Sequence, residues 1–389
     1  MKILELALGA ALVAATWLSV VVSLVVPRGI KSVYTRAMHT AVRWPFQYVA
    51  DRFKAYETKD RALAWAAPLA ILITLISWLV LFLAGYALLL AGASGLGFDA
   101  ALRESGSSLF TLGFASSARD RLTFLDFCAA ATGPVAIGLQ VGYLPALYTA
   151  YARRETEVTL LQARAGVPAW GPEILYRHVQ VAGLLDSLPD LYRGWERWSA
   201  EVSESHTSYP VLIHFRSPQP YRNWLIALLA VMDAAAMELA LNPSNPVSGT
   251  IRVGLRGGFT CLREIARSEG IPYDPDPDPD EDIQLTYEEF LQGVDMLRYA
   301  GYPIERTPEE AWPHFRGWRI NYESTAYALA YMIDAVPAPW SGPRRTPGQT
   351  VKVRTPRDRK PTRGLPPQTD ATTPQQPLES LQTTDDRAP

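Results

Sequence analysis

Apolar residues form long runs up to about residue 152 and recur at helical spacing after it. Ile3 to Val26 is a run of about 24 residues and Ala62 to Gly92 one of about 31 residues, and either can cross a bilayer core of ~30 Å. A third apolar helix is expected from about Leu122 to Tyr151. The pattern therefore predicts three transmembrane helices. We interpret the first as a retained anchor. A signal peptide is the alternative, but Pro27 and Arg28 stand where a small-residue cleavage site would be needed.

The stretch between the second and third runs contains a short amphipathic segment and a tight turn. Ala100 to Phe110 is amphipathic, Thr111-Leu112-Gly113-Phe114 follows it, and Ser116 to Arg121 is polar. A membrane helix, a half-length re-entrant helix, a narrow backbone turn and another membrane helix are the parts of a cation pore. Taken alone, the tetrapeptide is also compatible with an ordinary turn between helices.

Ala62 to Glu155 resembles the pore module of the potassium-channel family, with its outer helix, pore helix, filter and inner helix. The family's filter reads T-V-G-Y-G-D, and this chain has Thr111-Leu112-Gly113-Phe114-Ala115-Ser116 in the same frame. The resemblance implies an ion filter built from residues 111–115 and monovalent cations as its ligands. Each chain supplies one filter strand, so a homotetramer is expected. Gly113 can adopt a left-handed backbone, whereas Ala115 can do so only with strain, so we do not expect strict potassium selectivity.

The expected inner helix contains several small residues and prolines. Gly133, Gly138, Gly142 and Pro145 are the candidate hinge or gate positions, and Pro145, near the cytoplasmic end, is the first choice for a gate kink. The alternative is that the glycines only allow membrane helices to pack closely.

Charge sets the expected topology. The segment 28–61 carries eight Lys and Arg residues against three Asp and Glu, so the positive-inside rule places it in the cytoplasm. The N-terminus and the turn 111–115 are then outside and the C-terminus is cytoplasmic, in a cell membrane of the bacterial inner-membrane type. Phe46, Val49 and Phe53 recur behind Pro45, which predicts a helix that begins there and lies either on anionic lipid or against the cytoplasmic domain.

Residues 156–340 predict a mainly α-helical cytoplasmic domain. Val181 to Trp198 and Thr286 to Tyr299 read as amphipathic helices, the second with a capping box of Thr286 and Glu289. Tyr209 to Phe215 predicts a strand. Trp224 to Leu241 is apolar enough for a fourth span, but its two acidic residues favour a helix buried in protein.

Two polar segments complete the chain. The acidic segment 274–282 lacks the glycine and glutamate spacing of an EF-hand, so we expect a solvated loop. Residues 341–389 are rich in proline and polar residues, basic in the first half, and expected to be disordered. The predicted organisation is an anchor with a basic linker (1–61), a pore module (62–155), a helical domain (156–340) and a tail (341–389).

The remaining chemistry excludes several functional classes. The net charge of −2 argues against nucleic-acid binding, and no nucleotide, zinc or nucleophile motif occurs. Cys128 and Cys261 fall in segments expected in different compartments, so no disulfide is expected. We therefore expect no enzyme activity and no cofactor. The leading hypothesis is a monovalent-cation channel gated through its inner helix by the cytoplasmic domain. The alternative is a non-conducting membrane scaffold that recruits a cytoplasmic protein partner.

Overall fold

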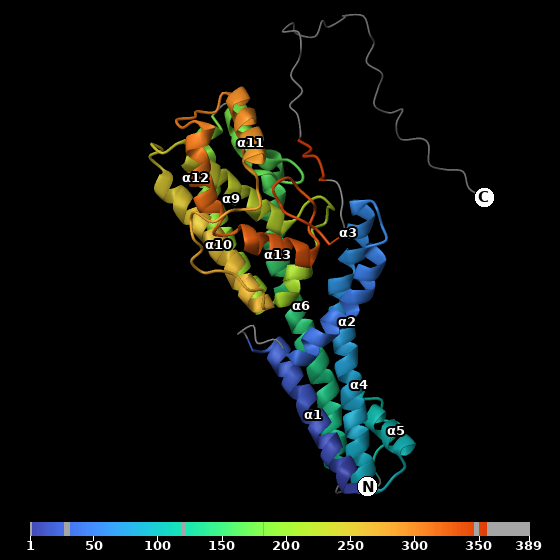
Figure 1. The fold of residues 1–389 in the computed structure, drawn as a ribbon. Helices are drawn as coiled ribbons and strands as arrows, with labels where there is room; N and C mark the ends of the chain where they lie inside the picture. Colours follow the sequence, from blue (N-terminus) through green and yellow to red (C-terminus); the bar gives the residue numbers. More distant parts are fainter. Residues whose placement is uncertain (1, 27–31, 118–121, 182, 346–349, 356–389) are drawn as a thin grey trace, which may run out of the picture. The chain divides into compact units, whose positions relative to one another are not determined.

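The computed structural model describes the chain except for residues 1, 27–31, 118–121, 182, 346–349 and 356–389. The described residues are helical and contain no strand, which confirms the prediction of an all-α fold (Figure 1). The α-helices are α1 (Lys2–Leu24), α2 (Val33–Ala50), α3 (Tyr56–Ala64), α4 (Ala66–Ser94), α5 (Phe98–Leu109), α6 (Thr123–Ala165), α7 (Gly171–Gln180), α8 (Leu188–Ser208), α9 (Trp224–Leu241), α10 (Ser248–Glu269), α11 (Tyr287–Ala300), α12 (Pro308–Arg319) and α13 (Glu323–Ile333). The 3₁₀ helices η2 (Leu185–Ser187) and η3 (Pro210–His214) flank α8.

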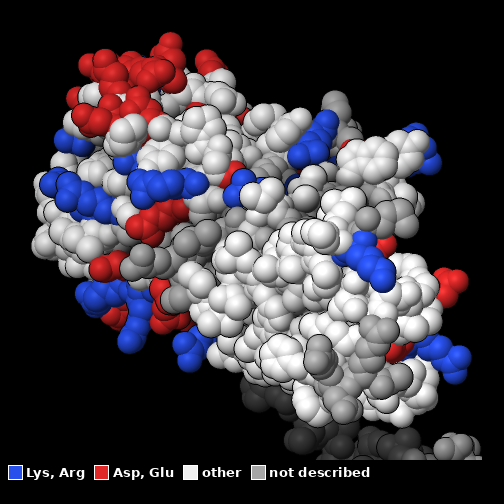
Figure 2. Space-filling model, turned by 90° about the horizontal axis from the view of Figure 1, so that it is seen from below, with Lys and Arg blue, Asp and Glu red and all other residues white. Residues whose placement is uncertain are grey.

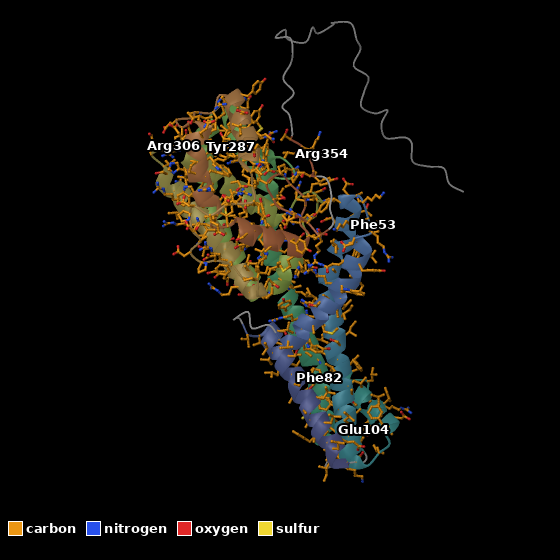
Figure 3. All side chains as sticks on the ribbon, in the orientation of Figure 1. Phe53, Phe82, Glu104, Tyr287, Arg306 and Arg354 are labelled. Carbon is orange, nitrogen blue, oxygen red and sulfur yellow. The ribbon has the colours of Figure 1, made fainter. Side chains whose placement is uncertain are left out.

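Helices α1, α4 and α6 lie side by side, with the short helix α5 against α4 and α6 (Figure 1). Trp78, Phe82 and Tyr86 of α4 are buried among them, together with Val20 of α1. Figure 3 labels Phe82 in this group. In Figure 2, charged side chains gather on one part of the visible face and a broad area of the rest carries few. Among the described residues, four helices are long and apolar enough to cross a membrane, namely α1, α3–α4, α6 and α9. The structure is therefore compatible with a multi-pass membrane protein.

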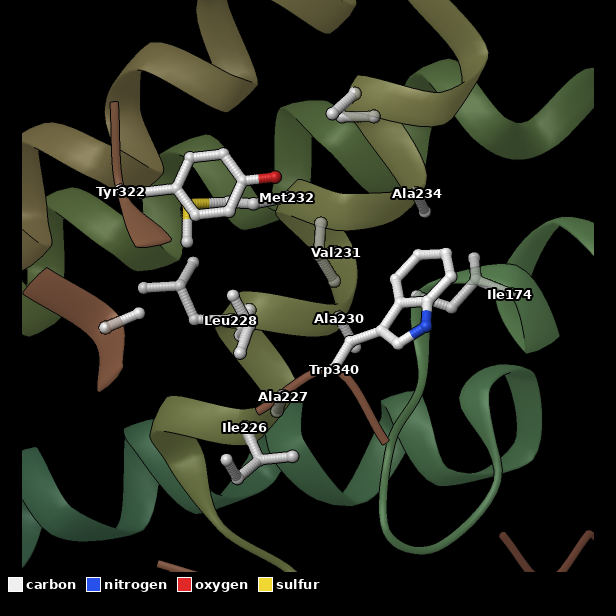
Figure 4. Packing of buried hydrophobic residues seen from close by; sticks show 14 of the residues in the cluster. Ile174, Ile226, Ala227, Leu228, Ala230, Val231, Met232, Ala234, Tyr322 and Trp340 are labelled. Carbon is white, nitrogen blue, oxygen red and sulfur yellow. The ribbon is translucent and has the colours of Figure 1, made fainter. Parts of the chain in front are cut away.

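Helix α9 is the centre of a second group of helices. All of its residues are buried, and α7, α8, α10, α12 and α13 pack around it. Figure 4 shows Trp340 and Tyr322 approaching α9 from different sides. No face of this helix is left for lipid, which agrees with the interpretation of Trp224 to Leu241 as a helix buried in protein.

The capping box predicted from Thr286 and Glu289 is confirmed. Helix α11 begins with the predicted capping box, in which the Thr286 hydroxyl accepts from the Glu289 amide at 3.2 Å. The Glu289 carboxylate accepts from the Thr286 amide at 3.0 Å. These reciprocal bonds satisfy amides that a helix start leaves without intrahelical partners.

Other local predictions were wrong. The predicted strand Tyr209 to Phe215 is the 3₁₀ helix η3, because its carbonyls and apolar side chains face other helices rather than a neighbouring strand. Pro45 does not start a helix but lies inside α2, which begins at Val33 and ends at Ala50. The amphipathic helix expected from Val181 begins only at Leu188, where Pro189 occupies a first-turn position.

Part of the predicted tail is packed against the helical domain. Arg344 donates to the carbonyls of Ala335 and Val336, at 2.6 and 2.8 Å. Arg354 and Val167 exchange two backbone hydrogen bonds of 2.9 Å each. The expectation of disorder from residue 341 is therefore wrong for residues 341–345 and 350–355. From residue 356 onward the predicted tail lies outside the described residues, as do 118–121 of the polar break.

Candidate functional site

Helix α5 ends in a turn that brings the chain back over its own last residues. The amides of Leu112 and Gly113 both point at the Ser107 carbonyl, with N···O distances of 2.8 and 3.4 Å. Thr111 has φ 55° and Gly113 has φ 72°, so the turn uses two left-handed positions. The prediction that Gly113 can take a left-handed backbone is confirmed. Ala115 does not take a positive φ, and Thr111 does so instead.

Two buried carboxylates hold this turn in place. Asp126, in the first turn of α6, accepts from the Ser108 hydroxyl at 3.0 Å and from the Ser117 amide at 2.9 Å. Glu104 of α5 accepts from the Ser117 hydroxyl at 2.6 Å (Figure 3). These acids are 5% and 7% exposed for Glu104 and Asp126. Sequence reasoning missed this role, although a lone acid at the start of an apolar helix was a usable signal for Asp126.

A further hydrogen bond, between Ala115 and Ser107, joins the turn to α5. The Ala115 amide donates to the Ser107 hydroxyl at 2.9 Å, so Ser107 binds the loop through its carbonyl and its side chain. The side chains of Leu112 and Phe114 point away from this contact and are 62% and 56% exposed. The Arg103 guanidinium lies 5.4 Å from the centre of the Phe114 ring. The turn thus has a polar inner side, bound by α5 and α6, and an apolar outer side.

The candidate gate residues fall into two groups. A Cβ at Gly133 would lie 2.0 Å from the Leu109 carbonyl oxygen, so Gly133 allows the end of α5 to touch α6. Gly138 and Gly142 have open space at the Cβ position and, with Pro145, are exposed on one face of α6. Helix α6 continues through Pro145 without interruption to Ala165.

Arg154 lies in the part of α6 that the predicted topology places in the cytoplasm, and it joins this helix to the helical domain. Its guanidinium binds Glu155 at 2.9 Å, His206 at 3.0 Å and the carbonyls of Leu212 and Phe215 at 2.8 Å each. Arg154 is fully buried. Apart from the adjacent Glu155, its partners lie more than 50 residues away in the chain, so no local pattern could reveal them.

His206 is the imidazole that accepts a hydrogen bond in this cluster. Burial, and then the charge of Arg154, lowers the pKa of His206 well below its usual value. The neutral ring can accept from Arg154 Nη1 through Nε2, with its other nitrogen 3.1 Å from the Ser205 hydroxyl. The bonding pattern and the pKa direction therefore agree on an uncharged His206.

Residues 209–217, which we call the η3 junction, connect several helices. Val211, Leu212 and Phe215 are buried against Ala67 and Ile71 of α4 and against Leu147 of α6. The Tyr151 hydroxyl of α6 donates to the Arg216 carbonyl at 3.0 Å. Both long helices that follow and precede the turn 111–115 therefore contact the same segment.

Arg216 extends this junction to α3 and α13. It pairs with Asp60 of α3 and donates to the Ile333 and Asp334 carbonyls at 2.8 and 3.1 Å. Lys59 of α3 forms a second ion pair with Asp334. The start of the long helix pair α3–α4 is therefore fixed to the helical domain by charge as well as by apolar packing.

Asp233, one of the two acidic residues inside α9, belongs to another buried cluster. Asp233 pairs with Arg319 and accepts from the Tyr322 hydroxyl at 2.9 Å. Arg319 also binds Glu323 at 2.7 Å, and Trp340 through its carbonyl at 2.7 Å. The cluster joins α9, α12, α13 and the following segment, and each ion is satisfied, so its role is structural.

The described residues contain no group of three or more His, Cys, Asp and Glu that could hold a metal ion. Comparison with known proteins gave no match to a family model, a curated protein or a solved structure.

Proposed function

We propose that this chain is the subunit of a monovalent-cation channel in a cell membrane, of the bacterial inner-membrane type. The observation that carries the proposal is the unit α4–α5–turn–α6. A short helix ends in a turn with two left-handed residues between two long apolar helices. Thr111, Leu112, Gly113, Phe114 and Ala115 are the proposed filter. Its carbonyls and the Thr111 hydroxyl replace water around the ion.

Four copies are proposed to surround the ion path. One chain supplies one turn and one inner helix, and a closed ring is required to enclose a pore. The exposed side chains of Leu112 and Phe114, and the exposed α6 face of Gly138, Val141 and Gly142, are available for contact with other copies. In this arrangement the N-terminus is outside the cell and the C-terminus is in the cytoplasm.

The helical domain is proposed to control the pore through α6. Arg154, a residue of α6, binds His206 and the η3 junction, and so joins this helix to the helical domain. A movement of the domain would therefore be transmitted to α6 directly, without a flexible connection. Pro145 and the exposed Gly138 and Gly142 lie between Arg154 and the proposed filter along the chain.

Ion flux tests the proposal. Purified protein in liposomes is given potassium and then sodium gradients, alongside the Gly113→Val variant. We expect flux of both ions from the native chain and background flux from the variant, because valine cannot keep the left-handed backbone of the turn. Gly301→Val is the matched control, since Gly301 also has a positive φ and open space but ends α11. Unchanged flux in Gly113→Val would contradict the filter assignment.

A non-conducting membrane scaffold is the second candidate, and a specific observation favours it. The amides of Leu112, Gly113 and Ala115 all return to Ser107, which makes the turn compact. A filter must instead offer successive carbonyls along the pore axis. Under this reading the helical domain recruits a cytoplasmic protein partner. Absence of flux from folded, fourfold protein with several applied voltages would favour the scaffold.

A further inference from the structure

A cavity of about 310 Å³ lies where the end of α1 and the start of α2 meet α6 and the helical domain. Its size falls in the range of small-ligand pockets. Residues of α1, α2, α6, α8, η3 and α10 line it, so elements distant in sequence contribute to its walls. The turn 111–115 contributes nothing to its lining.

The lining from α2 and the helical domain is polar and predominantly basic. Arg36 and Arg43 face the cavity with His39 and His214, and Glu269 is the acidic member of the lining. Arg43 lies 3.3 Å from the His214 ring nitrogens and donates to the Met332 carbonyl. Burial, and then the charges of Arg345 and Arg216, lowers the pKa of Arg43 to about 10, which leaves it charged at neutral pH.

The hydroxyl groups of the lining are already ordered. Ser23 of α1 and Thr35 of α2 share a hydrogen bond of 2.7 Å, and Ser32 accepts from the Thr35 amide at 3.5 Å. Thr40 and Ser208 add further hydroxyls. Arg36 and Arg43, with the hydroxyls of the lining, provide groups of the kind that bind phosphate oxygens.

The lining from the apolar helices has a different character. Val22 of α1, Val26 just after that helix and Tyr143 of α6 contribute apolar surface, joined by Pro210 and Val211 of η3. A free phosphate ion gains nothing from such surface. A phospholipid can use both the basic and the apolar lining, because its phosphate is joined to glycerol and acyl chains.

We propose that this cavity binds the phosphate headgroup of an anionic membrane lipid. Arg36 and Arg43 contact the phosphate, and Val22, Val26 and Tyr143 contact the glycerol and the first part of the acyl chains. The occupant joins α1 and α2 to Ser208, His214 and Glu269 of the helical domain. Lipid binding at this site does not depend on whether the turn 111–115 conducts ions.

Direct binding measurements test this site. Delipidated full-length protein in a neutral detergent is titrated with short-chain phosphatidylglycerol, short-chain phosphatidylcholine and inorganic phosphate. We expect saturable binding of phosphatidylglycerol and much weaker binding of the other two. Arg36→Gln should weaken phosphatidylglycerol binding about fivefold, the effect of one cation near an anionic lipid, and Arg36→Lys should keep it. Arg36 is exposed, so neither change should unfold the chain.

Arg153→Gln is the matched control. Arg153 is an exposed arginine of α6 outside the cavity lining, and its loss changes the net charge equally. Affinity unchanged in this control but reduced in Arg36→Gln supports the site. Equal weakening in both variants would show diffuse surface attraction and overturn it. Inorganic phosphate bound as tightly as phosphatidylglycerol would overturn the lipid assignment, as would equal binding of phosphatidylcholine.

Discussion

The buried arginines Arg154 and Arg319 each have several partners rather than one. Arg154 binds a carboxylate, an imidazole and two carbonyls, and Arg319 binds two carboxylates, a hydroxyl and a carbonyl. An arginine taken out of water requires such complete pairing, since a partly satisfied buried ion is costly. The requirement extends to His206, which must stay neutral beside Arg154. A proton on His206 would remove its acceptor nitrogen and place two cations in contact.

This makes the stability of the fold depend on pH. The pKa of His206 is lowered in the folded chain, whereas an unfolded histidine binds a proton near pH 6.5. Below that pH the unfolded state binds more protons, so the free energy of unfolding falls, by at most ~1.4 kcal/mol per pH unit for one group. The loss starts near pH 6.5 and continues down to the folded-state pKa. Thermal unfolding of the native chain and of His206→Gln, at about pH 7.5 and about pH 5.5, measures it.

The variant should show a shallower loss of stability on acidification than the native chain. Some dependence will remain, because burial also lowers the pKa of His178. His314→Gln is the control, since His314 is exposed and should keep the native profile. Parallel profiles for His206→Gln and the native chain would show that His206 is not the group responsible.

At the scale of elements, the η3 junction shows what a sequence pattern can and cannot predict. The capping box of α11 and the left-handed Gly113 depend on neighbours within a few residues, and both were predicted. The segment Tyr209 to Phe215 was predicted to be a strand, but η3 is shaped by its contacts with Arg154, α4 and α6. Those contacts join residues more than 50 positions apart. Their outcome is decided by packing, which local propensity does not contain.

Arg154→Gln should loosen this junction without disturbing the turn 111–115. Glutamine cannot reach Leu212, Phe215 and His206 together, and it leaves Glu155 without its cation. We expect amide exchange in residues 209–216 to become about tenfold faster or more, the effect of losing ~1–3 kcal/mol of local stability. Hydrogen–deuterium exchange with mass spectrometry measures it. Arg153→Gln, an exposed neighbour, is the control. Equal protection in both variants would contradict the role of Arg154.

At the scale of the whole molecule, the sequence predicted which segments form helices better than it predicted how those helices pack together. Long apolar runs identified α1, α4 and α6, and the acidic residues of Trp224 to Leu241 correctly favoured a buried helix. The partner of Asp233, Arg319, comes from a distant segment and could not be predicted. The sequence of α6 likewise does not show which face meets protein and which stays exposed, because apolar residues occur on all sides of the helix between Thr123 and Tyr151.

The exposed face of α6 gives a test of the fourfold arrangement. Val141 of α6 and Leu72 of α4 are both apolar, with 60% and 51% of their surfaces exposed in a single chain. If α6 surrounds a central axis, copies of Val141 face each other, whereas copies of Leu72 face lipid and lie far apart. Cysteine is introduced at either position after Cys128 and Cys261 are replaced by alanine.

A short bifunctional thiol reagent is then applied to the protein in membranes. Val141→Cys should give a ladder of linked chains that ends at four, and Leu72→Cys should remain mostly single, because only the first position repeats near the axis. Native mass spectrometry of the unlinked protein should give the same stoichiometry. A single chain by mass, or equal ladders from both positions, would remove the ring that an ion path requires. The filter assignment for residues 111–115 would then fail with it, because one turn cannot surround an ion.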